Sequence, residues 1–66
     1  MQIVLNGIPR QVAAGVTVAR LALEVVPTAR RIAVELNGEI LPRSRHAEHR
    51  LDDGDRVEIV QAIGGG

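Results

Sequence analysis

Hydrophobic and polar residues alternate along most of this 66-residue chain, and the period of the alternation changes from one segment to the next. Residues 1–5 are mostly apolar and branched, which is typical of a strand. Asn6-Gly7 follows, and both residue types tolerate the positive φ that a type I′ hairpin turn needs. Residues 8–13 then return as a second strand. Because Pro9 has no backbone N–H to donate, we expect that strand at an edge of its sheet.

The next segment has the period of a helix. Thr17 can cap its start with a side-chain oxygen. Apolar residues at i, i+3, i+4 and i+7 form one stripe of this helix: Val18, Leu21, Ala22 and Val25. Pro27 ends it at or before residue 26, because the residue before a proline disfavours helical geometry. The pattern predicts a helix over residues 18–26.

The second half of the chain returns to the period of a strand. Residues 31–36 alternate, which indicates a half-buried strand. Asn37-Gly38 repeats the turn signal, residues 39–41 form a short returning strand, and Pro42 ends it. Residues 43–51 are polar and irregular, with room for one helical turn. The Asp52-Asp53-Gly54-Asp55 run predicts a tight turn.

Residues 56–63 form the last predicted strand. Val57 and Ile59 point inward on it, and Glu58, Val60 and Ala62 lie on the opposite face. We expect this strand in the interior of the sheet beside the first one.

The order of these elements is strand, strand, helix, strand, short strand, strand. It predicts an α+β fold in which one helix covers a mixed sheet of four or five strands, the ubiquitin-like β-grasp arrangement. The domain spans residues 1–63, followed by a flexible glycine tail at 64–66. The predicted core consists of Ile3, Leu5, Leu21, Val25, Val34, Leu36, Val57 and Ile59.

Composition narrows the possible functions. The net charge is zero and aromatic residues are at 0%, which argues against a basic footprint or stacking platform for nucleic acid. The eight basic residues are all Arg and there is no Cys, so lysine and thiolate chemistry are excluded. No apolar run approaches the ~18 residues of a membrane span. We therefore expect a soluble cytoplasmic protein without a membrane partner.

The sequence ends on Ala62-Ile63-Gly64-Gly65-Gly66. Glycine has no Cβ, so this end is thin enough to thread a narrow channel in a partner. The one reactive group that it can offer there is the carboxylate of Gly66. Val60, Ala62 and Ile63 are apolar and lie beside this tail, which favours partner binding by these residues and by Gly64 and Gly65.

Two other polar clusters are less promising. His46 and His49 could converge on one turn, but no further ligand is evident, and we expect solvated loop histidines. Asp52, Asp53 and Asp55 lack the spacing of a calcium loop and are interpreted as turn formers. The sequence therefore predicts no metal site and no catalytic pair.

The whole chain resembles the ThiS family, the sulfur-carrier proteins of thiamine biosynthesis. The resemblance rests on Asn6-Gly7 after the opening strand, on the terminal glycines, and on segments 34–38 (VELNG), 42–44 (PRS), 46–47 (HA) and 51–60 (LDDGDRVEIV). The family commonly ends in two glycines, whereas this chain has three. We take Gly66 as the reactive residue, since its carboxylate is the last.

The resemblance implies a function. A partner related to ubiquitin-activating enzymes adenylates the Gly66 carboxylate with ATP. Sulfur mobilised by a cysteine desulfurase, or supplied by another donor, displaces AMP and leaves a C-terminal thiocarboxylate. Thiazole synthase then uses that sulfur to build the thiazole ring. The chain is thus a protein co-substrate and not an enzyme, and it needs no cofactor of its own.

Two alternatives stay open at this point. One is the small subunit of molybdopterin synthase, which shares the fold, the tail and the sulfur chemistry; those chains tend to be longer and to contain aromatic residues. The other is a β-grasp interaction domain whose tail carries no chemistry.

Overall fold

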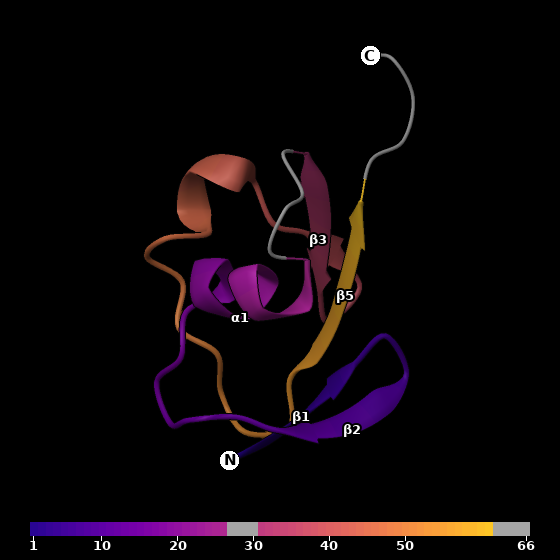
Figure 1. The fold of residues 1–66 in the computed structure, drawn as a ribbon, viewed down its shortest axis with the longest axis vertical. Coiled ribbons are helices and arrows are strands. Elements are labelled where there is room, and N and C mark those ends of the chain that lie inside the picture. Colours follow the sequence, from indigo (N-terminus) through magenta and orange to yellow (C-terminus); the bar gives the residue numbers. More distant parts are fainter. Residues whose placement is uncertain (27–30, 62–66) are drawn as a thin grey trace.

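The computed structural model describes residues 1–26 and 31–61 (Figure 1). They form a five-stranded sheet with one α-helix against it, which confirms the predicted α+β, β-grasp fold. No helix in this part of the chain is long and apolar enough to cross a membrane. The elements are β1 (Gln2–Leu5), β2 (Ile8–Gln11), α1 (Val18–Val25), β3 (Ile32–Leu36), β4 (Glu39–Ile40), the 3₁₀ turn η1 (Arg43–Arg45) and β5 (Arg56–Gln61).

Strand β5 lies in the middle of the sheet, whose order is β2-β1-β5-β3-β4. It runs parallel to β1 and antiparallel to β3, while the two hairpins β1–β2 and β3–β4 are antiparallel. The predicted neighbourhood of the first and last strands is therefore confirmed. Pro9 lies in β2, at an edge of the sheet as expected, where its missing N–H costs no ladder hydrogen bond.

Helix α1 begins where predicted, because its first amides all find acceptors. The Arg20 N–H donates to Oγ1 of the capping residue Thr17 at 3.2 Å. The amides of Val18 and Ala19 donate to the carbonyls of His49 and His46 at 3.0 and 2.9 Å. The helix start is thus tied to the 46–51 loop, and the helix ends at Val25, in line with the prediction. Pro27 lies outside the described residues.

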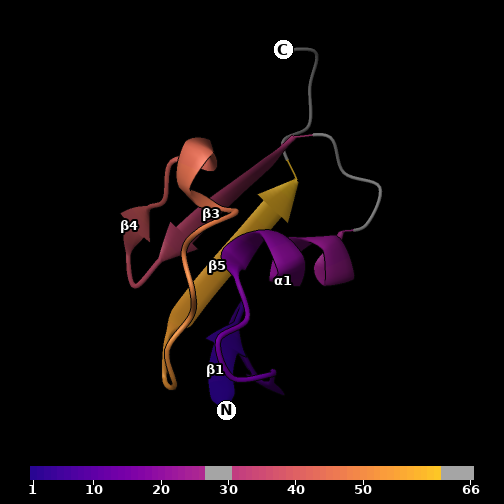
Figure 2. The same cartoon turned by 90° about the vertical axis from the view of Figure 1, so that its left-hand side faces the viewer.

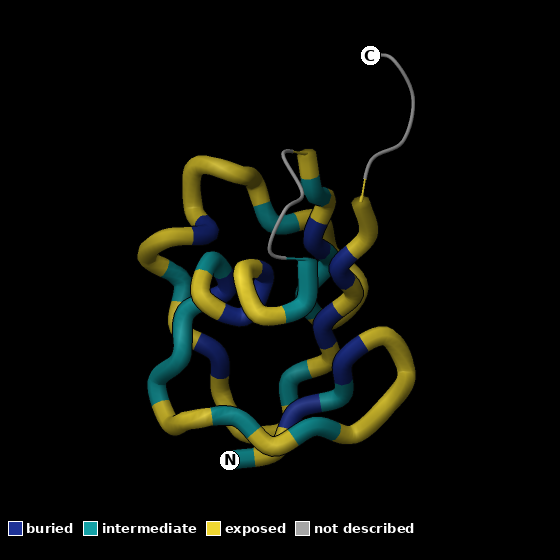
Figure 3. Tube along the Cα trace, in the orientation of Figure 1, coloured by how far each residue is buried: buried dark blue, intermediate teal, exposed yellow. Residues whose placement is uncertain are grey.

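The core lies between α1 and one face of the sheet (Figures 2 and 3). Its buried hydrophobic residues are Ile3, Leu5, Val18, Leu21, Ala22, Val34, Leu51, Val57 and Ile59. Two predicted core residues, Val25 and Leu36, are partly buried and pack at its margin. The predicted core list lacked Val18 and Ala22, although both lie in the predicted helical stripe. It also lacked Leu51, which follows a polar segment without periodicity. Its N–H donates to the Val16 carbonyl at 2.9 Å, and this bond helps to dock the loop on the core.

The expectation that both histidines are solvated is wrong for His46. Its side chain is 7% exposed, and Nε2 lies 3.1 Å from the Leu41 carbonyl oxygen. The physical reason is that η1 turns the chain back over α1, where the His46 carbonyl accepts from the Ala19 N–H. His49, the other histidine of this loop, is half-buried.

Candidate functional site

Strand β5 has two unlike faces. Val57 and Ile59 point toward α1 and are buried, whereas Glu58 and Val60 are exposed on the opposite face. Val60 is 57% exposed, as the alternation of the strand predicted. The described part of the strand extends to Gln61. The remaining predicted site residues, Ala62, Ile63, Gly64, Gly65 and Gly66, lie outside the described residues.

The register of the sheet shows which residues surround Val60. Ala33 of β3 lies directly opposite it, and Glu35 lies opposite Glu58. On the far side of β3, Ile40 lies opposite Glu35 and is 69% exposed. Residues opposite one another project on the same side of a sheet. We call this set, Ala33, Glu35, Ile40, Glu58 and Val60, the outer face.

The sequence analysis missed Ala33 and Ile40 as candidate binding residues. A signal for Ile40 was available. A two-residue Asn37-Gly38 turn pairs Leu36 with Glu39 and Glu35 with Ile40, which is the register observed. That register puts Ile40 on the same side of the sheet as Glu35, away from the buried Val34.

Asn6 has a second role besides its turn. Its backbone has φ 50°, the positive value that the turn requires. Its side chain is bonded twice to the backbone of Ile59: Oδ1 accepts from the Ile59 N–H at 2.9 Å, and Nδ2 donates to the Ile59 carbonyl at 3.2 Å. The carboxamide thus pairs with β5 as one more residue of β1 would. The sequence predicted the turn and not this contact.

Asn37, the matching residue of the other hairpin, also holds β5, but at its beginning. With φ 51°, it accepts from the Arg56 N–H at Oδ1, 2.9 Å away. Its Nδ2 donates to the Asp55 carboxylate at 3.0 Å. Both Asn-Gly turns therefore position the central strand, from opposite sides and at different heights.

Two of the aspartates before β5, Asp53 and Asp55, accept hydrogen bonds from backbone amides. The Asp55 Oδ2 accepts from the Asp52 N–H, and the Asp53 Oδ1 accepts from the Gln2 N–H, each at 2.8 Å. The bond between Asp52 and Asp55 lies within the predicted turn, as their interpretation as turn formers requires, whereas Asp53 ties the turn to β1. Within residues 1–26 and 31–61, no three His, Asp or Glu side chains come together as possible metal ligands.

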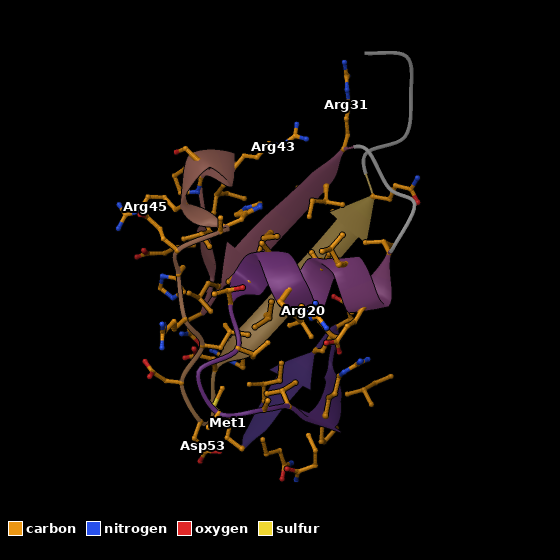
Figure 4. All side chains as sticks on the ribbon, turned by 60° about the vertical axis from the view of Figure 1, so that its left-hand side comes forward. Met1, Arg20, Arg31, Arg43, Arg45 and Asp53 are labelled. Atoms are coloured by element: carbon orange, nitrogen blue, oxygen red, sulfur yellow. The ribbon has the colours of Figure 1, made fainter. Side chains whose placement is uncertain are left out.

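A cavity of about 340 Å³ lies on the helix side of the molecule, away from the outer face. Aliphatic side chains of α1 and β3 line it, together with Arg43 and His46 from the segment around η1. Figure 4 shows the segment that carries Arg43 beside the helix. The described lining offers no nucleophile, and His46 Nε2 is already engaged with Leu41.

The sheet order, the parallel β1–β5 pair and the single helix place the chain among ubiquitin-like β-grasp proteins. A sequence model of the ThiS family matches residues 3–66. The crystal structure of the thiamine biosynthesis protein ThiS from Geobacter metallireducens superposes with a TM-score of 0.84 at 38% identity, and each chain is covered completely. The chain belongs to the ThiS family, which confirms the predicted resemblance.

Two kinds of curated relatives match all 66 residues. The chain is 38% identical to the sulfur carrier protein ThiS of Escherichia coli and covers the whole of it. It is 46% identical to a thiazole synthase of Paramagnetospirillum magneticum, of which it spans 20%. The predicted function, sulfur carriage in thiamine biosynthesis, is thus confirmed at the level of the family.

Proposed function

We propose that this chain accepts sulfur at its C-terminal carboxylate, on Gly66, and delivers it to thiazole synthase. The observation that carries the proposal is the match to a sulfur carrier of the same length, with both chains covered completely. The position of β5 supports it, since the central strand leads directly to the terminal glycines.

The chemistry needs an activated carboxylate. A carboxylate is a poor electrophile, so its oxygen first attacks the α-phosphorus of ATP and pyrophosphate leaves. A sulfide nucleophile then attacks the acyl adenylate at the Gly66 carbonyl carbon. The new C–S bond replaces the C–O bond to AMP, and AMP leaves with the bonding electrons. The product is a thiocarboxylate that can give its sulfur to a further acceptor.

The chain itself takes the part of a co-substrate in these steps. It contains no Cys and no Lys, so it has no thiol or side-chain amine that would attack its own adenylate or thioacid. ATP binding comes from an adenylating enzyme related to ubiquitin-activating enzymes. The sulfur comes as sulfide from a donor, or from a cysteine desulfurase, whose persulfide sulfur is first reduced to sulfide by a thiol that is itself oxidised to a disulfide.

Thiazole synthase is the partner with the strongest support. Proteins of that name contain a stretch similar to the whole of this chain, which makes up a fifth of their length. We place the contact on the outer face around Val60, together with Ala62, Ile63, Gly64 and Gly65. Burying such apolar side chains against a partner is favourable, at roughly 25 cal/mol per Å².

A single-turnover experiment tests this function. The chain is loaded with sulfur, separated from the activating enzyme, and added to thiazole synthase with its other substrates. A carrier yields at most one thiazole per chain, whereas a catalyst would continue to turn over. The Gly65→Val variant, whose Cβ branches would obstruct a narrow channel, should fold normally and form no product. A loaded chain that gives no thiazole, but supplies sulfur to a molybdopterin synthase large subunit, would overturn the assignment.

A further inference from the structure

The two neighbours of β5 pair with it over different lengths. On one side its pairing with β3 continues from Leu36↔Val57 to Ile32↔Gln61, near the end of the strand. On the other side the pairing with β1 ends at Leu5↔Val57. Beyond that point the Asn6 carboxamide holds Ile59, and the chain turns away at Gly7 into β2. In the described part of the molecule, no strand pairs with β5 on that side beyond Val57. Figure 1 shows the upper part of β5 with no strand beside it on the β1 side.

The backbone hydrogen bonds show which residues of β5 face this open side. The Arg56 carbonyl accepts from Asn37, at the β3 side, and the Val57 carbonyl accepts from Asn6, at the β1 side. Successive residues of a strand direct their N–H and C=O groups to alternate sides. The backbone N–H and C=O of Val60 are therefore directed toward β3. Those of Gln61 are directed to the open side, one pair of residues beyond the Asn6 carboxamide.

The open side lacks the protection that the other two edges have. Exposed strand edges invite pairing with another chain, and proteins blunt them with proline, charge or short length. The β2 edge contains Pro9 and Arg10, and the β4 edge is two residues long. Val60 and Gln61 carry no charge and no proline, and both are exposed. An edge left unprotected at the end of the functional strand is suited to binding.

We propose that the open side of β5 at Gln61 receives an extended segment of thiazole synthase, which adds to the sheet in line with β1. Such a segment would pair with the N–H and C=O of Gln61. It could not extend to Ile59, because the Asn6 carboxamide already binds the backbone of that residue. This inference rests on the proposed function. A partner that reads glycines must recognise backbone groups, since glycines offer no side chains, and an added strand does this by main-chain hydrogen bonds.

Three substitutions test the pairing, with thiazole synthase as the titrant in calorimetry. Gln61→Pro removes the N–H on the open side, where a strand tolerates proline. It should leave the melting temperature close to wild type and weaken binding about fivefold or more, the contribution of one backbone hydrogen bond. Gln61→Ala keeps the N–H and should bind like wild type. Val60→Pro removes an N–H that faces β3, so it should lower the melting temperature.

Amide hydrogen exchange gives a second measurement, which needs no variant. The Val60 N–H should be protected in the free chain, while the Gln61 N–H should exchange fast and become protected once thiazole synthase binds. Wild-type affinity of Gln61→Pro, or an unprotected Gln61 N–H in the complex, would overturn the inference. It would leave the proposed function intact, because that function is tested separately, by whether the wild-type chain is loaded with sulfur and supplies it to the synthase.

Discussion

The beginning and the end of β5 differ in how the sheet holds them and in how far they are buried. From Val57 to Ile59 the strand is held from both sides, by β1 and Asn6 on one and by β3 on the other, and it contributes two buried side chains. At Val60 and Gln61 the only strand of the described residues that pairs with it is β3, and both residues are exposed. One strand thus anchors the fold with its first residues and presents a binding edge with its last ones.

The largest effect on stability should come from shortening a buried side chain in the part of β5 that is held from both sides. Ile59 is 4% exposed in the core, so Ile59→Ala should lower the free energy of unfolding by about 2–5 kcal/mol. Val60→Ala, one residue further on, should change it by less than about 0.5 kcal/mol, because the side chain is exposed. Urea melts of both variants measure the difference. Equal losses would mean that the two parts of the strand are not distinct.

Removing the Asn6 side chain should lower the stability of the fold, because this side chain holds β5 at Ile59. Asn6→Gly keeps the positive φ and loses both bonds to Ile59, which should cost about 1–3 kcal/mol. Asn37→Gly is the matched control. Its side-chain bonds are exposed, whereas those of Asn6 are partly buried, so its loss should be smaller. The Ile59 amide should also exchange faster in Asn6→Gly, and unchanged exchange would argue against the double contact.

A negative charge at Val60 should weaken binding to thiazole synthase and leave the stability of the fold unchanged. Val60→Asp should weaken the affinity for thiazole synthase about tenfold or more, because the carboxylate would lose its water without gaining a partner. Gln11→Asp adds the same charge on β2, at an edge of the sheet, and serves as the control. Calorimetry that gives the same affinity for both variants would remove Val60 from the interface.

The smallest effect on stability should come from Glu35 and Glu58, the two glutamates of the outer face. Glu35 and Glu58 lie directly opposite each other, and like charges in that position repel. Glu58→Gln should therefore raise stability by about 0.2–1 kcal/mol at low salt. The double variant with Glu35→Gln should add little more, since either change removes the same repulsion. Additive gains in urea melts would show that the two carboxylates do not interact.

Local patterns explain what the sequence could predict. Both Asn-Gly turns, the helix cap at Thr17 and the inward side of β5 depend on residues close together in the chain, and all of them were found as expected. The burial of His46 and Leu51 was not predictable in this way. It depends on the loop docking against the start of α1, about which the periodicity of a polar segment contains no information.

For the candidate site, too, the sequence predicted what depends on neighbouring residues and missed a contact between residues far apart in the chain. Alternation along the last strand was enough to place Val60 on the exposed face. The contact of Asn6 with Ile59 joins residues 53 positions apart, so the sequence predicted the turn and missed its hold on β5. The predicted roles of residues 62–66 stay predictions, because these residues lie outside the part of the chain that the structure describes.

Intact mass spectrometry tests sulfur carriage most directly. The chain is incubated with the adenylating enzyme, ATP and a sulfur donor, with the ThiS protein of Escherichia coli as the positive control. We predict a mass increase equal to the replacement of one oxygen by sulfur, assigned by fragmentation to Gly66. With no Cys in the chain, no side-chain thiol can hold that sulfur. An unchanged mass beside a loaded control, or sulfur found away from Gly66, would contradict the carrier function.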